Sequence, residues 1–458
     1  MGAVLLSGDA WSSPAKAVIT LDPTYGPPTT DVNVSGTGFG AKEHIVIRFD
    51  LNKVGKSVTD GSGSFSATIA VPASATPKKH LIKAIGSTSS SKAIAPFLVR
   101  TDWARFRDDL NGSGVNPYEN TLDPSNVSGL QVAWSSPTSG GIDSSPAVAD
   151  GLVFVGSADG SVYARNATTG ASVWSYPTGG GVSSSPAVVN GIVYVGANDG
   201  RVYALDAITG SLEWSHGTGG IVYSSPVVTA GIVYAASEDG TLYALSAATG
   251  KVKWSYPTGD GMDSSPAVVD GVVYVGSWDD NVYALSASTG ALVWSYTTGG
   301  GVSSSPAVAN GTVFVGSDDG YVYALSAATG SVTWSYRVGG VGELSPAVDG
   351  GVVFVGGWSY SKAPAYGHAK LYALDASTGA PKWVQKFGSG PAYSSPAVAN
   401  GVVYIGRLDG TVLALDAATG DTDWSYLTGG DVYSSPAIAD GTVYVGSYSG
   451  VLYAFGLR

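Results

Sequence analysis

From about Trp134 to the end of the chain, short apolar or alternating runs follow one another between turn residues. One example is the apolar run Gly191–Gly196, followed by the turn Asn198–Gly200 and the alternating run Arg201–Leu205. Runs of this length between Gly-containing turns predict strands joined by tight hairpins. The pattern supplies four strands in about forty residues, and none of it has the period of a helix.

The same unit recurs eight times, and each copy carries a Ser-Pro pair. The prolines of these pairs are Pro146, Pro186, Pro226, Pro266, Pro306, Pro346, Pro396 and Pro436, spaced by 40 residues except for one step of 50. A fixed period in this range is typical of repeat architectures, in which no unit can bury its own apolar face. Four antiparallel strands per unit predict the blade of a β-propeller.

The count of strands predicts how the ring of blades closes. Leu130–Trp134 matches the fourth strand of a unit but precedes the first complete unit, and the chain ends after three strands of the eighth. The early strand can therefore complete the last blade, which removes exposed strand edges. The predicted fold class is all-β: an eight-bladed β-propeller over residues 130–458, closed by an N-terminal strand.

Residues 18–99 form a separate predicted unit, because short strands such as His44–Arg48 lie there between Gly, Pro and Ser clusters. The stretch Leu21–Pro28 and the turns Ser35–Gly40 and Asp60–Phe65 resemble bacterial Ig-like modules of the IPT/TIG kind. The resemblance implies a β-sandwich that acts as a spacer or adhesive unit. Residues 100–129 are expected to connect it to the propeller.

The first 17 residues resemble the remnant of a signal peptide. Ala3–Leu6 is apolar, and Ala15–Ala17 offers small residues for cleavage, although a basic start is missing. No other run is long and apolar enough to span a membrane. These features predict an exported protein, secreted or at the cell surface, without a transmembrane segment.

Composition narrows the function classes. The net charge of −12 argues against a nucleic-acid partner, since phosphate binding needs a basic face. The absence of Cys excludes disulfides, thiol catalysis and Cys-ligated metals. The 65 Gly residues, without a collagen period, fit the turn content of an all-β protein.

A corner motif joins the third and fourth strands of the units. It reads Ala204-Leu-Asp-Ala-Ile-Thr-Gly-Ser-Leu-Glu-Trp214, and the equivalent tryptophans are Trp134, Trp174, Trp254, Trp294, Trp334, Trp383 and Trp424. This spacing resembles the tryptophan-docking motif of quinoprotein-type propellers, the PQQ-like repeat family. The expected role of the motif is packing, with the Gly leaving a seat for an indole that bridges neighbouring blades.

The PQQ-like family contains pyrroloquinoline-quinone dehydrogenases and also non-catalytic scaffolds, such as the propeller subunit of the outer-membrane assembly machinery. The resemblance implies, for the enzymes, a Cys pair beside the quinone and a calcium ion held by Glu, Asn and Asp. The Cys pair is impossible here, and the other residues cannot be matched to positions in this sequence. No cofactor is therefore predicted, with the quinone and calcium kept as the alternative.

Candidate ligand-binding positions are those where the units differ, because positions that stay alike serve the fold. Before each Ser-Pro strand the units vary among carboxylates, phenols and serine, and unit six has a ten-residue insertion. We expect these loops and the turns between second and third strands to surround the channel mouth. The candidates are Asp143, Tyr223, Asp263, Glu343, Trp358, Tyr360, Tyr366, His368, Tyr393, Arg407, Tyr433 and Tyr448.

The carboxylates Asp143, Asp263 and Glu343 open units one, four and six, so they stand too far apart around a ring to hold one calcium ion. Aromatic faces beside carboxylates suit a sugar chain or a peptide segment; neutral drift on solvated loops is the alternative.

Three functions remain open. The protein is predicted to be a non-enzymatic binding or scaffold protein with a protein or polysaccharide partner. The alternatives are a quinone-dependent or carbohydrate-active enzyme, and a structural subunit of a cell-surface assembly.

Overall fold

The computed structural model describes residues 16–340, 342, 344–358, 368–389 and 394–457. In this part of the chain, 41 strands accompany a single 3₁₀ helix, η1 (Val127–Gly129). The all-β prediction is confirmed. The chain divides into two compact units, residues 1–101 and 102–458, so most of the predicted connector belongs to the second unit.

The first unit consists of two sheets that share one apolar core. Its strands are β1 (Val18–Asp22), β2 (Tyr25–Gly26), β3 (Asp31–Thr37), β4 (His44–Phe49), β5 (Asn52–Val58), β6 (Phe65–Ala70), β7 (Lys78–Gly86) and β8 (Lys92–Val99). The strand orders are β1-β3-β6 and β2-β8-β7-β4-β5. Alternate residues of β3 and β4, such as Val34 and Ile47, are fully buried between the sheets, which is the two-residue period of a strand with one apolar face.

In the described residues, the second unit contains eight sheets of four or five strands, which we call blades one to eight. Their strands, from the inner to the outer, are β11 (Ala147–Ala149), β12 (Leu152–Gly156), β13 (Ser161–Asn166) and β14 (Ser172–Pro177) in blade one; β15 (Ala187–Val189), β16 (Ile192–Ala197), β17 (Arg201–Asp206) and β18 (Leu212–Gly217) in blade two; β19 (Val227–Thr229), β20 (Ile232–Ala236), β21 (Thr241–Ser246) and β22 (Val252–Pro257) in blade three; and β23 (Ala267–Val269), β24 (Val272–Gly276), β25 (Asn281–Ser286) and β26 (Leu292–Thr297) in blade four.

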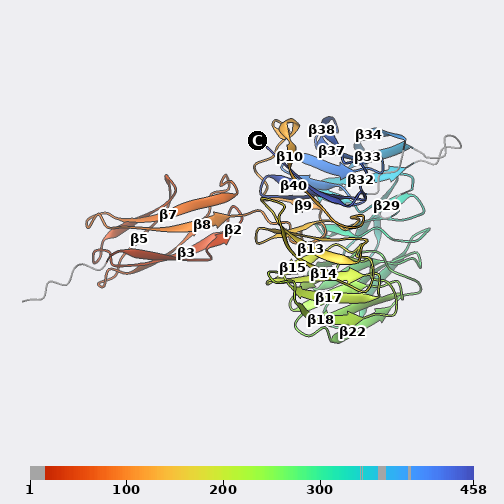
Figure 1. The fold of residues 1–458 in the computed structure, drawn as a ribbon, viewed down its shortest axis with the longest axis horizontal. Coiled ribbons are helices and arrows are strands. Elements are labelled where there is room, and N and C mark those ends of the chain that lie inside the picture. The colour runs from red at the N-terminus through yellow and green to blue at the C-terminus, as the bar shows by residue number, and fades with distance from the viewer. Residues whose placement is uncertain (1–15, 341, 343, 359–367, 390–393, 458) are drawn as a thin grey trace, which may run out of the picture. The chain divides into compact units, whose positions relative to one another are not determined.

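The remaining blades repeat the order (Figure 1). Their strands are β27 (Ala307–Ala309), β28 (Thr312–Gly316), β29 (Tyr321–Ser326) and β30 (Val332–Arg337) in blade five; β31 (Ala347–Asp349), β32 (Val352–Trp358), β33 (His368–Asp375) and β34 (Pro381–Ser389) in blade six; β35 (Ala397–Ala399), β36 (Val402–Gly406), β37 (Thr411–Asp416) and β38 (Thr422–Leu427) in blade seven, extended by β9 (Val115–Asn116); and β39 (Ala437–Ala439), β40 (Thr442–Ser447), β41 (Val451–Gly456) and β10 (Gln131–Pro137) in blade eight.

The first hairpin of each blade has a two-residue turn. In blade one, Ala149 pairs with Leu152, so Asp150 and Gly151 form the loop, with φ values of 53° and 76°. Positive φ at both central residues defines a type I′ turn, whose twist matches that of the strands. Asp-Gly, Asn-Gly, Gly-Gly and Ala-Gly pairs occupy this place in the other blades, which explains how the repeat sets the strand register.

Blade eight combines strands from the two ends of the second unit. β10 pairs antiparallel with β41, from Gln131 opposite Gly456 to Pro137 opposite Val451. Each inner strand contacts the inner strand of the next blade, and β39 of blade eight contacts β11 of blade one. The contacts between blades therefore follow one another without a gap.

Each docking tryptophan joins its blade to the next. Trp214 of blade two donates its indole N–H to the carbonyl oxygen of Ala247 in blade three, at 2.8 Å. A Cβ atom on Gly250 of the same corner would lie only 2.5 Å from the Trp214 ring. Seven equivalent indole bonds run between the other neighbouring blades, including Trp424 to Leu130 at the junction of the chain ends. The motif therefore serves packing between blades.

Residues 103–116 of the connector follow the inner strands around the second unit. Their partners are one residue of each inner strand in seven blades: Val148, Val188, Val268, Val308, Val348, Val398 and Ile438. Within this segment Trp103 is 2% exposed and belongs to an apolar core with blades one, seven and eight. The connector segment therefore lies at one end of the central opening, which we call the inner end.

Candidate functional site

A cavity of about 730 Å³ lies at the centre of the blades, and we call it the mouth cavity. The order of residues along each inner strand determines which of them reach this cavity. In six blades the residue two places before the Ser-Pro serine lines the cavity first, and the serines come next. In seven blades the connector pairs with the inner strand three residues beyond the serine. Phe106 of the connector also lines the cavity, which places this segment at its inner end.

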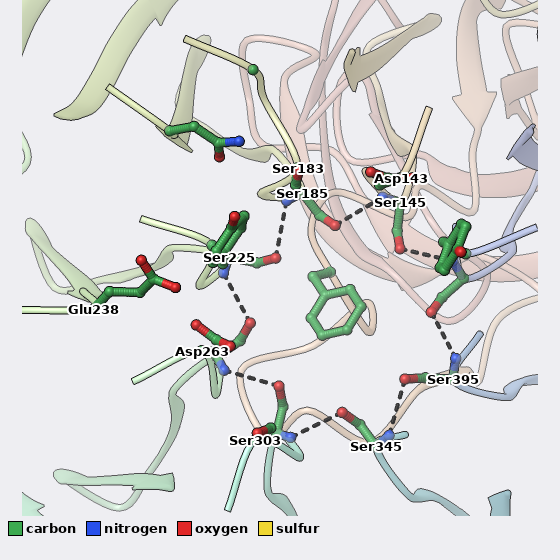
Figure 2. Close-up of a pocket in the computed structure, with 18 of the residues that line it drawn as sticks. Asp143, Ser145, Ser183, Ser185, Ser225, Glu238, Asp263, Ser303, Ser345 and Ser395 are labelled. Carbon is green, nitrogen blue, oxygen red and sulfur yellow. Dashed lines mark hydrogen bonds between the residues drawn. The ribbon is translucent and has the colours of Figure 1, made fainter. Parts of the chain in front are cut away.

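The serines of the eight Ser-Pro pairs form a ring of hydrogen bonds (Figure 2). The backbone N–H of each donates to Oγ of the serine in the next blade, over distances of 2.9 to 3.1 Å. The ring runs through Ser145, Ser185, Ser225, Ser265, Ser305, Ser345, Ser395 and Ser435 and returns to Ser145. The sequence marked these serines as elements of the fold, but they also form the wall of the cavity.

The variable position before each Ser-Ser-Pro brings six residues to the cavity. They are Asp143, Ser183, Tyr223, Asp263, Ser303 and Tyr433. Turns between the second and third strands add Ala158, Asn198, Glu238, Trp278 and Tyr448. These two sets of loops come together around the cavity, and five of the candidates from the sequence, namely Asp143, Tyr223, Asp263, Tyr433 and Tyr448, lie among them.

The carboxylates of the cavity come from blades one, three and four, as Asp143, Glu238 and Asp263. Burial raises the pKa of Asp143 above its usual value, because desolvation disfavours the charged form. The Oδ1 atom of Asp143 is buried without a hydrogen-bond partner. Among the described residues, no group of three His, Cys, Asp or Glu side chains could hold a metal ion.

Aromatic rings stand at the entrance of the cavity. The Trp278 side chain is 40% exposed, and its Nε1–H donates to Ser303 Oγ at 3.1 Å. Tyr433 and Tyr448 meet edge to face, with ring centroids 5.6 Å apart, and Tyr448 is 53% exposed. Large apolar groups left open to solvent beside a polar cavity are a common feature of binding sites.

The other sequence candidates lie elsewhere or outside the described residues. Trp358 ends β32, pairs with Gly340 through the backbone and packs against the core between blades five and six. Arg407 forms a 2.8 Å ion pair with Asp409 and lies over the Phe387 ring. Neither is among the described residues that line the cavity. Glu343, Tyr360, Tyr366 and Tyr393 lie outside the described residues, and so does the side chain of His368, the first residue of β33.

Among the lining residues that were missed from the sequence are Asn198, Glu238, Trp278 and Phe106. Asn198, Glu238 and Trp278 occupy the turn that carries Tyr448 in blade eight. Comparing this turn across all units would have found them, because the residue at this position varies among Ala, Asn, Glu, Trp, Asp, Leu and Tyr. Phe106 could not be found by this comparison, because the connector does not repeat.

The sequence matches the PQQ_2 family model, described as outer membrane protein assembly factor BamB, over residues 125–262, 258–357 and 339–458. These overlapping matches span more than half of the chain. The chain therefore belongs to this family of propeller repeats, as the corner motif indicated. A search of curated proteins gives no significant match.

Solved structures with the same fold have diverse roles. Quinohemoprotein alcohol dehydrogenase from Comamonas testosteroni is 20% identical, with a TM-score of 0.68 over 78% of this chain and 80% of that chain. BamB from Moraxella catarrhalis is 20% identical, with a TM-score of 0.61 over 71% of this chain and 99% of that chain. The computationally designed Ika8 protein is 19% identical, with a TM-score of 0.61 and the same two coverages. These similarities show the fold alone.

The quinone and calcium of the dehydrogenases do not fit the described cavity residues. The chain has no Cys for the pair beside the quinone. Asp143 and Asp263 lie three blades apart, and a calcium ion needs its oxygen ligands at about 2.3–2.6 Å. We therefore derive no reaction step from these groups.

Proposed function

We propose that this protein is a non-enzymatic binding or scaffold protein that acts outside the cytoplasm and holds its ligand in the mouth cavity. The observation that carries the proposal is the cavity itself: about 730 Å³, lined by serines, three carboxylates and exposed aromatic rings, with the connector at its inner end. This volume lies in the range of natural ligand sites, about 300–1,000 Å³. The described lining offers groups for recognition and no metal-holding cluster.

The architecture that we propose for this function is a closed eight-bladed propeller. In it, β10 acts as the closing strand, and the first unit is an Ig-like spacer. The pairing of β10 with β41 and the ring of serine bonds support closure. A closed ring gives the loops a rigid frame, which lowers the entropic cost of ordering a binding site.

The proposed location rests on the family description, which names an outer membrane protein assembly factor, and on the predicted signal remnant. In the described part of the chain, no helix is both long and apolar enough to cross a membrane. A protein partner follows more directly from the family than a polysaccharide. A polysaccharide ligand remains the alternative, and the glycan array described below would detect it.

The test fills the mouth cavity without disturbing the fold. Ser183 and Ser303 occupy the position where Tyr223 and Tyr433 stand in blades three and eight, so this backbone site already accepts a tyrosine. The double variant Ser183→Tyr/Ser303→Tyr should fold normally and lose ligand binding, because two phenol rings then occupy the cavity. Peptide and glycan arrays probed with purified protein measure this loss.

Thr333→Tyr is the matched control, because Thr333 is exposed on the outer strand β30. Its array profile should equal that of the wild type. Equal profiles for all three proteins would show that ligands bind away from the mouth cavity and would contradict the proposal. Uptake of pyrroloquinoline quinone with calcium, seen in the absorption spectrum of the wild type, would contradict the non-enzymatic assignment.

A further inference from the structure

We infer that the mouth cavity binds a basic side chain, the guanidinium or ammonium group of an Arg or Lys residue in an extended polypeptide partner. The inference rests on the proposed function and specifies the chemistry of its ligand. It stands on three observations: the charge of the lining, the aromatic rings at the entrance, and the closure of the inner end.

The charge of the lining is unbalanced. Asp143, Glu238 and Asp263 line the cavity, whereas none of its described lining residues is Lys, Arg or His. Arg107 of the connector donates to the carbonyl oxygen of Ser305, but its side chain is 3% exposed and interacts electrostatically with Asp109. Arg105, next to Phe106, interacts electrostatically with Asp108 and Asp109. The described lining side chains therefore carry negative charge only, and this charge favours a bound cation. Charges of one sign in a recess also focus the potential and attract the opposite charge.

The position of Asp143 strengthens this point. Its Oδ1 atom is buried without a hydrogen-bond partner, which raises the free energy of the charged carboxylate, and a cation close to the carboxylate offsets this cost. A guanidinium or ammonium group supplies several N–H donors on one flexible stem. Such a group can reach carboxylates on different blades through direct or water-mediated bonds, whereas a bare metal ion needs converging oxygens.

The aromatic rings favour an organic cation over an inorganic one. Trp278 and Tyr448 are 40% and 53% exposed, and Tyr433 stacks edge to face on Tyr448. A cation over the face of such a ring is stabilised by about 0.5–2 kcal/mol. The apolar stem of Lys or Arg packs on the rings of one side of the entrance while its charged end enters the cavity.

The closed inner end determines how the ligand enters. The connector pairs with the inner strands of seven blades, and Phe106 lines the cavity at that end. This arrangement favours entry of one projecting side chain from the mouth over a polypeptide threaded through the opening. The exposed rings at the entrance then contact the residues that flank it.

The experiment uses fluorescein-labelled Gly-Ser nonapeptides with one central residue, either Arg or its neutral isostere citrulline. Fluorescence anisotropy with the full-length protein at low salt should show the Arg peptide binding about tenfold or more tightly than the citrulline peptide. The preference should weaken at high salt, because salt screens the charges. Free arginine amide should compete weakly, because it lacks the flanking residues.

Asp143→Asn/Asp263→Asn should lose the preference for Arg about tenfold, and Trp278→Ala should weaken binding of both peptides. Asp421→Asn should behave like the wild type, because Asp421 is exposed near the outer strand β38. Circular dichroism melting confirms that each variant is folded. These substitutions separate the charge of the cavity from the net charge of the protein.

Equal affinities for Arg and citrulline peptides would overturn the inference. If the filled variant Ser183→Tyr/Ser303→Tyr still abolished binding of those peptides or of glycans, the proposed function would stand with a neutral ligand. If no ligand depended on the cavity, both proposals would fall. Arginine amide binding as tightly as the peptide would replace the polypeptide partner by a small amine.

Discussion

Removing residues 451–458 should unfold or aggregate the second unit. This deletion eliminates β41, which lies between β10 and β40 in blade eight. It also removes the buried side chains of Leu452, Ala454 and Phe455, of which each is at most 1% exposed. Loss of buried Leu and Phe side chains costs about 5 kcal/mol or more together, comparable with the whole stability of many domains.

A shorter deletion provides the control for this truncation. A chain that ends at Gly456 retains the complete register of β10 and β41 and loses only Leu457, 39% exposed, and Arg458. It should melt within a few degrees of the wild type and remain soluble. If both truncated proteins had the wild-type melting temperature and solubility, the pairing of the chain ends would not stabilise the ring.

Gly250→Ala should lower the free energy of unfolding by about 3 kcal/mol. Gly250 has a φ of +66°, which costs an alanine about 1 kcal/mol. The new Cβ would also lie 2.5 Å from Cε3 of Trp214, whose indole is held by its bond to Ala247. Such overpacking costs a further 1–3 kcal/mol or so.

Gly271→Ala measures the backbone effect alone. Gly271 has a φ of +78° in a hairpin turn, and nothing lies within 4 Å of the position of its Cβ. This variant should lose only about 1 kcal/mol, the backbone term alone. Urea unfolding monitored by tryptophan fluorescence measures both. Equal losses would mean that the indole does not press on the glycine, and that the docking motif does not couple the blades.

The repeat made much of the fold predictable. Asp150-Gly151 and its equivalents specify the turn, the alternating runs specify the strands, and Trp214 with Gly250 specifies how blades meet. These signals are local and occur many times, so each copy supports the others. Comparison with the structure accordingly confirms the all-β class and the family of propeller repeats.

The site was less predictable for physical reasons. Asp143 and Tyr433 stood out because the repeat makes exceptions visible, yet Phe106 reaches the cavity from a segment with no repeat. The serines have a double role, since their Oγ atoms both bind the next blade and face the cavity. Trp358 and Arg407 were exceptions as well, but their side chains satisfy local packing and charge. A residue that departs from the repeat therefore marks a site only where its side chain faces the cavity.

Hydrogen exchange of the serine amides tests most directly whether the blades form the closed ring on which the mouth cavity depends. The Ser435 N–H donates to Ser145 Oγ across the junction of blades eight and one, at 2.9 Å, while the Ser185 N–H makes the equivalent bond between blades two and three, at 3.0 Å. A closed ring predicts equal protection of these two amides, because both are held by the same contact. Rapid exchange of Ser435 beside a protected Ser185 would contradict closure and, with it, the cavity.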